Sequence, residues 1–308
     1  MRLMDTAGLV MFSRGAGVSE FVTLERVTAG GSSAFSLLRH LGCALSSPTV
    51  SGCWVTGPSL QPEIVARMGR LSGPLIWHIK SLFVPDNATF ELDEALALLA
   101  REAARAGAIH LNCRVAENSH VLIAARRAGF VQSRVEFLYV LPAGEGPVDG
   151  SVESMTMELG LRRRAPSDDM AIFRLYSAST PAEVRSHAGM TFDEWASGIE
   201  SPSHAAQEYV QDREGQINAW IRIFDSGATR YFEIMVHPDS HGSVPSLLEC
   251  VVAGAGNKVA ISVVPEYAVS TITALELKGF RGVKTYYSLV RTMAWRVEQT
   301  AAAVATIN

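Results

Sequence analysis

The sequence predicts an α/β protein in which one strand–helix–strand unit occurs twice in tandem. Two observations support this prediction. Residues 109–137 can be set beside residues 259–287 with a constant shift of 150, and the apolar patterns typical of strands and helices then coincide. The length of 308 residues suits two domains of ordinary size, and an apolar content of 48% is enough to fill their cores.

The matching positions follow the same order in both copies. Gly129-Phe130 falls on Gly279-Phe280, and Ala124 falls on Ala274. Each glycine suits the left-handed position that ends a helix. The predicted strand, helix and strand are 109–115, 118–128 and 131–141 in the first copy, and 259–264, 268–278 and 283–293 in the second. Identities are few, so a chance match between two generic units remains an alternative.

The remaining elements are clearer in the second half. Thr191 is expected to cap helical structure, and the apolar spacing of residues 91–106 predicts a core-facing helix in the first half. The other predicted elements of the second half are a strand at 161–164, helices from 166 and over 181–195, a hairpin of 208–212 with 217–224, a strand at 230–237 and a helix at 243–252.

A stretch rich in Pro and Gly, 142–150, suits a domain boundary. We therefore predict an N-terminal domain over residues 1–145, a linker over 146–160 and a C-terminal domain over 161–308. Each repeat is expected to form a twisted mixed sheet flanked by helices.

Composition excludes several classes of protein. The net charge of −4 gives no electrostatic reason to expect nucleic acid as a partner. The four cysteines form no C-x-x-C pair, and no run of about 18 apolar residues could cross a membrane. These features predict a soluble cytoplasmic protein with no nucleic-acid or membrane partner.

The element order, together with Val236-His237-Pro238 after a strand and Glu117-Asn118 ahead of Gly129, resembles the GNAT family of acyl-CoA N-acyltransferases. The resemblance covers residues 161–297 well and residues 9–142 more loosely. It implies two tandem GNAT-like repeats, the first of them degenerate. It also implies that acyl-CoA lies in a V-shaped gap between the fourth and fifth strands of a repeat.

The resemblance assigns cofactor-binding positions to the second repeat. The strand backbone at Ile234, Met235 and Val236 would hold the pantetheine. The family's glycine-rich phosphate loop falls on His241, Gly242, Ser243, Val244 and Ser246, where only one glycine remains. In the first repeat the loop, 88–93, has no glycine and carries acidic residues at the helix start, which repel a pyrophosphate.

The family's usual general-acid Tyr is replaced by Ala125 and Leu275. Glu233 is the candidate general base, and Tyr286 or Tyr287 could supply the missing acid. The alternatives are structural: Glu233 would pair with Arg230 or Arg222, and both tyrosines would serve packing.

The function that we expect is transfer of an acyl group, expected to be acetyl, from acyl-CoA to a small-molecule or protein amine. The second repeat is the more suitable to be active, and a homodimer is compatible with the sequence. The alternative is a catalytically inactive tandem protein that binds a metabolite or a protein partner. His237 and His241 lie near Asp239, but Pro238 and Gly242 interrupt any helix that would align them, so no metal cofactor is expected.

Overall fold

The computed structural model describes residues 19, 21–28, 51–56 (backbone only), 64–84, 91–144, 158–200, 206–213 and 215–293. The elements before residue 145 are α2 (Leu24–Thr28), β1 (Ser51–Thr56), β2 (Ile64–Arg70), β3 (Ile76–Phe83), α4 (Leu92–Arg105), β4 (His110–Ala116), α5 (Val121–Arg127) and β5 (Val131–Leu141). The later elements are β6 (Leu161–Arg163), η1 (Pro166–Asp168), α7 (Asp169–Ser179), α8 (Ala182–Ala188), α9 (Phe192–Gly198), β7 (Gln207–Arg213), β8 (Gln216–Ser226), β9 (Thr229–Val236), η2 (Pro238–Ser243), α10 (Val244–Ala253), β10 (Val259–Pro265), α11 (Val269–Leu277) and β11 (Arg281–Thr292).

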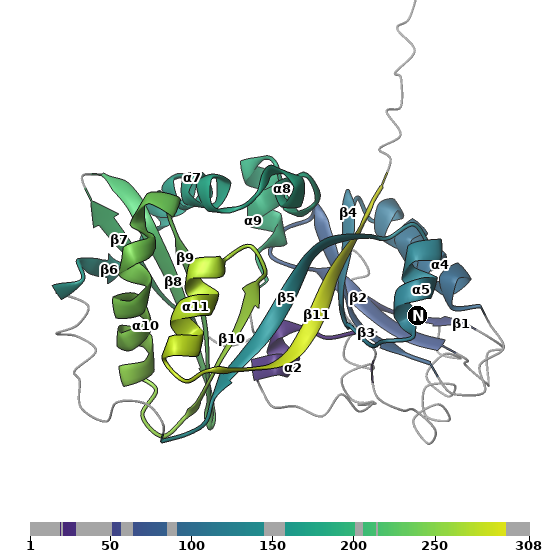
Figure 1. The fold of residues 1–308 in the computed structure, drawn as a ribbon. Helices are drawn as coiled ribbons and strands as arrows, with labels where there is room; N and C mark the ends of the chain where they lie inside the picture. The colour runs from purple at the N-terminus through teal and green to yellow at the C-terminus, as the bar shows by residue number, and fades with distance from the viewer. Residues whose placement is uncertain are drawn as a thin grey trace, which may run out of the picture.

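The described strands form one sheet of eleven, in the order β1-β2-β3-β4-β11-β5-β10-β9-β8-β7-β6. We expected a separate sheet for each repeat, and this expectation is wrong, because the strands of both repeats belong to one sheet. The reason lies in the last strand of each repeat. β11 pairs with β4 of the first half, and β5 pairs with β10 of the second half, while β5 and β11 also pair with each other. Figure 1 shows these two long strands side by side at the centre of the molecule.

The internal repeat is confirmed within this single sheet. β3 and β9 have the same length, and their bounds differ by a constant 153 residues. β3 pairs with β4, and β9 with β10, in parallel over only three residue pairs. Gly129 and Gly279 both have positive φ values, 82° and 86°, where the helices α5 and α11 end. Glycine reaches this conformation without the cost that a side chain would add.

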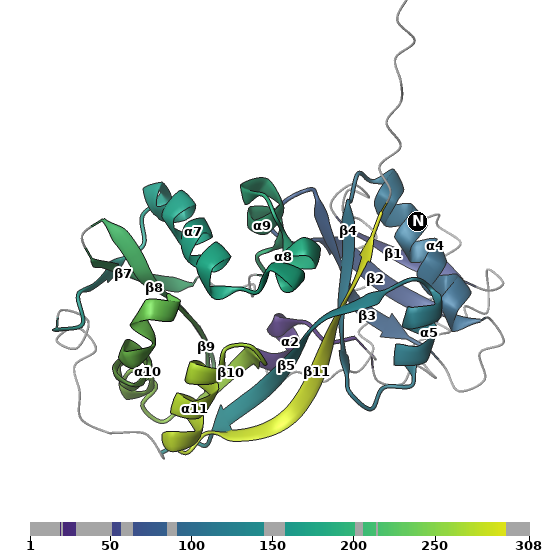
Figure 2. The ribbon, with the colours of Figure 1, turned by 45° about the horizontal axis from the view of Figure 1, so that its top comes forward.

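Helices cover both faces of the sheet (Figure 2). On one face, α4 and α5 pack against the strands of the first half and form one hydrophobic core. On the same face, α10 and α11 pack against the later strands and form a second core. On the other face, α7 and α9 pack against β8 through Trp195 and Trp220, and α2 packs on β9 through Leu24 and Tyr231. The helix α8 also contacts β5 and β11, so helices of the second half cover part of the first half's sheet.

Most of the predicted local elements are present. The helix expected at 91–106 is α4, which buries Leu96 and Leu99. The segment predicted as helical at 181–195 is divided into α8 and α9 at Gly189, whose φ of 137° interrupts it. Thr191 caps α9, as predicted, by accepting a hydrogen bond from the Glu194 amide.

Most of the predicted linker, 146–160, lies outside the described residues, so the domain boundaries remain a prediction. Among the residues that the structure describes, no helix is long and apolar enough to cross a membrane.

Candidate functional site

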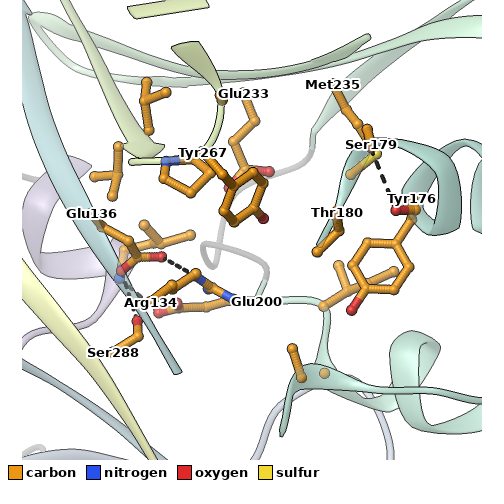
Figure 3. A pocket seen from close by; sticks show the side chains of 18 of the residues that line it. Arg134, Glu136, Tyr176, Ser179, Thr180, Glu200, Glu233, Met235, Tyr267 and Ser288 are labelled. Carbon is orange, nitrogen blue, oxygen red and sulfur yellow. Dashed lines mark hydrogen bonds and ion pairs between the residues drawn. The ribbon is translucent and has the colours of Figure 1, made fainter. Parts of the chain in front are cut away.

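A cavity of about 340 Å³ opens where β9 and β10 separate. The two strands pair only from Thr229 to Tyr231 and from Val259 to Ile261. Just beyond, the Ser262 hydroxyl donates a hydrogen bond of 2.9 Å to the Phe232 carbonyl and bridges the strands near the apex of the gap. Residues from both strands then line the cavity, which Figure 3 shows from close by.

The predicted cofactor residues divide into two groups around this cavity. Ile234, Met235, Val236 and His241 line it. The cavity lining does not include the other predicted positions, which are Gly242, Ser243, Val244 and Ser246. The Val244 side chain is buried in the core beneath α10, with 1% exposure, so only its backbone could face a ligand.

The predicted phosphate loop is folded as the short helix η2, which runs directly into α10. The Val244 amide is already bonded to the His241 carbonyl, and Pro245 has no amide hydrogen to offer. This arrangement leaves fewer amides for a pyrophosphate than a glycine-rich loop provides. A Cβ added at Gly242 would have no atom within 4 Å, so the backbone there is open on one side.

The corresponding gap in the first repeat is filled by the chain itself. An inserted segment, defined here as Ser19, Phe21 and Val22, lies between β3 and β4. The Leu82 amide donates to Ser19 Oγ at 3.1 Å, and the Val22 amide donates to the Arg114 carbonyl at 2.9 Å. Phe21 bridges to Val115 and is fully buried. An acyl-CoA could not occupy this gap while the segment remains.

The two gaps can be compared position by position. The offset of 153 residues between β3 and β9 places Met235 where Leu82 stands, and the offset of 149 residues between β4 and β10 places Val263 where Arg114 stands. Met235 and Val263 both line the open cavity of the second repeat. The backbone sites that hold the inserted segment in the first repeat therefore correspond to cavity wall in the second.

Glu233 lines the cavity, and its carboxylate is fully engaged. Oε2 pairs with Arg222 Nη1 at 2.8 Å, and Oε1 accepts a hydrogen bond of 2.8 Å from the Tyr231 hydroxyl. Burial and the adjacent Glu233 carboxylate raise the pKa of Tyr231 well above its ordinary value, so this hydroxyl stays protonated. Of the two alternative partners, Arg222 pairs with Glu233, while Arg230 pairs with Asp225.

Neither candidate tyrosine on β11 belongs to the cavity lining. Tyr286 is buried directly opposite Glu136 in the β5–β11 pair, and burial raises its pKa. Tyr287 points to the other face, because successive side chains alternate along a strand. Its hydroxyl donates to Glu117 Oε1 at 3.0 Å, and this hydrogen bond raises its pKa.

A different tyrosine reaches the cavity. Tyr267 lies between β10 and α11, and Figure 3 shows its ring projecting into the cavity on the side of Glu233. The shift of 150 used for the sequence comparison sets Asn118 beside Ala268, whereas β4 and β10 differ by 149 residues in the structure. That offset brings Tyr267 to the position of Asn118, so the sequence comparison missed this residue by one position. Hydroxyls of Tyr176, Ser179 and Thr180 line the opposite wall.

The first half contributes a buried charged wall to the same cavity. Glu136 Oε2 lies 2.6 Å from Arg114 Nε and accepts from the Ser288 hydroxyl at 2.8 Å, while Glu136 Oε1 lies 2.8 Å from Arg134 Nε. Arg114 Nη1 also pairs with Glu200 at 3.1 Å. Burial alone would raise the pKa of Glu136, but the two arginines hold it well below its usual range.

Two neutral polar side chains extend this wall. His78 and Asn112 are paired in register on β3 and β4, and both line the cavity. His78 Nε2 and Asn112 Oδ1 are buried, and neither has a hydrogen-bond partner among the residues that the structure describes. Burial lowers the pKa of His78 to about 4, so the ring is neutral at physiological pH.

The sequence prediction missed this wall, although β5 carries a recognisable signal. Arg134 and Glu136 occupy alternate positions of a strand, and two charges on one face of a strand near a core are unusual. Within the described residues, no group of three or more His, Cys, Asp or Glu side chains could hold a metal ion.

No protein-family model matches the chain, and no curated protein matches it. Among solved structures, a GCN5-related N-acetyltransferase from Sphaerobacter thermophilus is similar over 94% of each chain, with 13% identity and a TM-score of 0.56. A tandem GNAT protein from the clavulanic acid biosynthesis pathway covers 94% of this chain and 95% of its own, with 12% identity and a TM-score of 0.47, which is too low to support an argument. The first likeness and the internal repeat together confirm the predicted fold: the chain has the fold of the GNAT N-acetyltransferases, in two tandem repeats.

Proposed function

We propose that this protein transfers an acyl group, expected to be acetyl, from acyl-CoA to an amine, and that the reaction takes place in the cavity of the second repeat. The observation that carries this proposal is the open gap between β9 and β10. The fold supports acyl transfer by analogy, whereas the open gap is a feature of this chain's own site.

The first repeat supports the location. Its own gap holds an extended segment of the chain by backbone hydrogen bonds from Leu82 and to Arg114. A pantetheine arm is an extended chain with amide groups and needs similar partners. The equivalent backbone of the second repeat faces a cavity of about 340 Å³, within the range of small-molecule sites, about 300–1,000 Å³.

The chemistry requires one group that accepts a proton from the amine and another that protonates the thiolate. The amine nitrogen attacks the thioester carbonyl, the carbon–sulfur bond breaks, and the sulfur leaves as a thiolate. We assign proton acceptance to Glu233, directly or through a water, and protonation of the thiolate to Tyr267.

Titration calorimetry with acetyl-CoA tests the binding half of the proposal. We expect saturable binding at one site per chain, because the first gap is filled. Gly242→Asp should weaken binding at least tenfold by placing a carboxylate near the phosphates, and the site has room for the side chain. Gly242→Asn is the matched control, since it adds the same volume without charge. Absence of binding by several acyl-CoAs would overturn the proposal.

Glu233→Gln tests the catalytic half. If Glu233 takes the proton, kcat should fall at least a hundredfold, with acetyl-CoA affinity preserved and the acidic limb of the pH profile lost. Glu249→Gln is the control, because Glu249 lies on α10 away from the cavity lining, where it pairs with Lys278. Unchanged turnover in Glu233→Gln would remove this residue from the mechanism.

Two observations favour the second candidate, a catalytically inactive protein that binds a metabolite or partner. The phosphate loop is folded as η2, and both oxygens of Glu233 are engaged. This candidate predicts acyl-CoA binding without thiol release for any amine, or binding of a different metabolite. Mass spectrometry of the natively purified protein would identify such a ligand.

A further inference from the structure

The cavity reaches beyond the gap between β9 and β10 to the wall formed by the first half. That wall carries arginines and glutamates whose contacts can be followed atom by atom. Among the described residues, three carboxylates line the cavity, Glu136, Glu200 and Glu233, and each of their six oxygens has a partner. The carboxylates are therefore satisfied without a ligand.

The three arginines of the cavity differ from one another. Arg114 lies between Glu136 and Glu200, and its side chain is only 4% exposed. Arg222 pairs with Glu233 and stacks over the Trp220 and Phe224 rings, also at 4% exposure. Arg134 forms one ion pair through Nε and is 27% exposed. Its two Nη groups have no hydrogen-bond partner among the described residues.

The geometry points to an acceptor molecule that carries an oxyanion, a carboxylate or a phosphate, in addition to its amine, with Arg134 as the side chain that binds the oxyanion. This inference rests on the function proposed above. Glu136 holds the Nε edge of the guanidinium, which leaves the two Nη groups for a second anion. A planar guanidinium binds carboxylate and phosphate oxygens through two parallel hydrogen bonds.

The rest of the wall suits a small polar molecule. His78 Nε2 and Asn112 Oδ1 line the same cavity and have no partner in the described part of the chain, so a ligand that reaches them gains hydrogen bonds there. Glu233 lies at the gap and Arg134 on the wall across from it, so Arg134 can bind the anion of an acceptor whose amine lies at the gap (Figure 3). A lysine side chain within a protein carries no oxyanion of its own, so this arrangement favours a small amine.

Turnover with acetyl-CoA and matched acceptor pairs tests the inference. Each pair differs in the anion alone: amino acids against their carboxamides, and phosphoethanolamine against ethanolamine. We expect kcat/KM to favour the anionic member at least tenfold, and the preferred pair identifies carboxylate or phosphate. Arg134→Gln should abolish the preference by raising KM for the anionic member, with little change for the neutral one. Arg127→Gln, an exposed charge on α5, should leave the preference intact.

A binding experiment separates this inference from the proposed function. Saturation-transfer NMR compares N-acetyl amino acids and N-acetyl-aminoethyl phosphate with their neutral counterparts in the absence of acyl-CoA. Arg134-dependent binding without any acetyl-CoA binding would refute the proposed function and keep the anion site. Turnover or binding that does not distinguish the members of any pair would refute the anion site and leave the proposed function in place.

Arg134→Gln is expected to fold, because Glu136 retains Arg114 and Ser288 as partners. If circular dichroism shows otherwise, Arg134→Lys replaces it. That variant keeps the charge but loses the two-pronged geometry, so an intermediate KM for the anionic acceptor is expected. A KM equal to that of the wild type would count against binding through the guanidinium. The comparison within the wild-type protein decides the question even if neither variant folds.

Discussion

The buried ion pairs of Glu136 give the sharpest test of how the charged wall of the cavity contributes to stability. Its side chain is 5% exposed and lies 2.6 Å from Arg114 Nε and 2.8 Å from Arg134 Nε. Glu136→Gln would leave both guanidiniums on this wall without their shared counter-charge. Removal of one partner from a buried ion pair costs about 3–5 kcal/mol. We expect a loss near the lower value, about 3 kcal/mol, because the amide can still accept hydrogen bonds.

Urea unfolding, followed by tryptophan fluorescence and circular dichroism, measures this loss. With a denaturant slope of about 3 kcal/mol per M, the midpoint should fall by about 1 M. Glu183→Gln is the control, because this glutamate is exposed on α8, and its effect should stay within about 0.5 kcal/mol. If Glu136→Gln shifts the midpoint no further than Glu183→Gln, the ion pairs contribute little to stability and the reasoning is refuted.

Two more predictions concern stability. The pKa of His78 is lowered from 6.5 to about 4, so the unfolded chain binds a proton that the folded protein excludes. The free energy of unfolding should therefore decrease by about 3 kcal/mol as the pH falls from 6.5 to 4. In His78→Gln the urea midpoint should depend less on pH over this range, and an unchanged dependence would contradict the assignment. Phe21→Ala should destabilise the protein by about 3–5 kcal/mol, because a fully buried phenyl ring is removed from the gap of the first repeat. Thermal melting would show this loss against the milder Phe21→Leu, and equal melting temperatures for the two variants would mean that the ring does not fill the gap.

Local patterns in the sequence were sufficient to predict the repeat and most of the elements. Gly129 and Gly279 marked the ends of equivalent helices because only glycine adopts a positive φ without strain. The pairing of β5 with β10 of the second half, and of β11 with β4 of the first half, could not be predicted in this way. A strand shows the same alternation whichever neighbour it pairs with, and these partners are far apart in the chain.

The prediction of the site succeeded for residues that the repeat alone places. It failed for residues whose place depends on the pairing of β5 with β10 and of β11 with β4. Glu233 and three consecutive β9 residues line the cavity because strand order alone places them at the gap. Tyr286 and Tyr287 do not line it, because Tyr286 is buried opposite Glu136 and Tyr287 is hydrogen-bonded to Glu117, while Ser288 and Leu289 of the same strand do line it. Arg134 and Glu136 were missed because the pairing of β5 with β10 brings first-half residues to the second repeat's cavity.

The crossing of β11 also has a consequence for synthesis on the ribosome. Tyr287 and Glu117, which contact each other across the β4–β11 pair, are 170 residues apart in the chain. At about 5–20 residues per second, β4 emerges on the order of ten seconds or more before the strand that completes its edge. During that interval the nascent chain presents an unpaired edge, which is a template for aggregation. Final assembly of the amino-terminal half must therefore wait until β11 has been synthesised, and chaperones that cover open strand edges would protect it in the meantime.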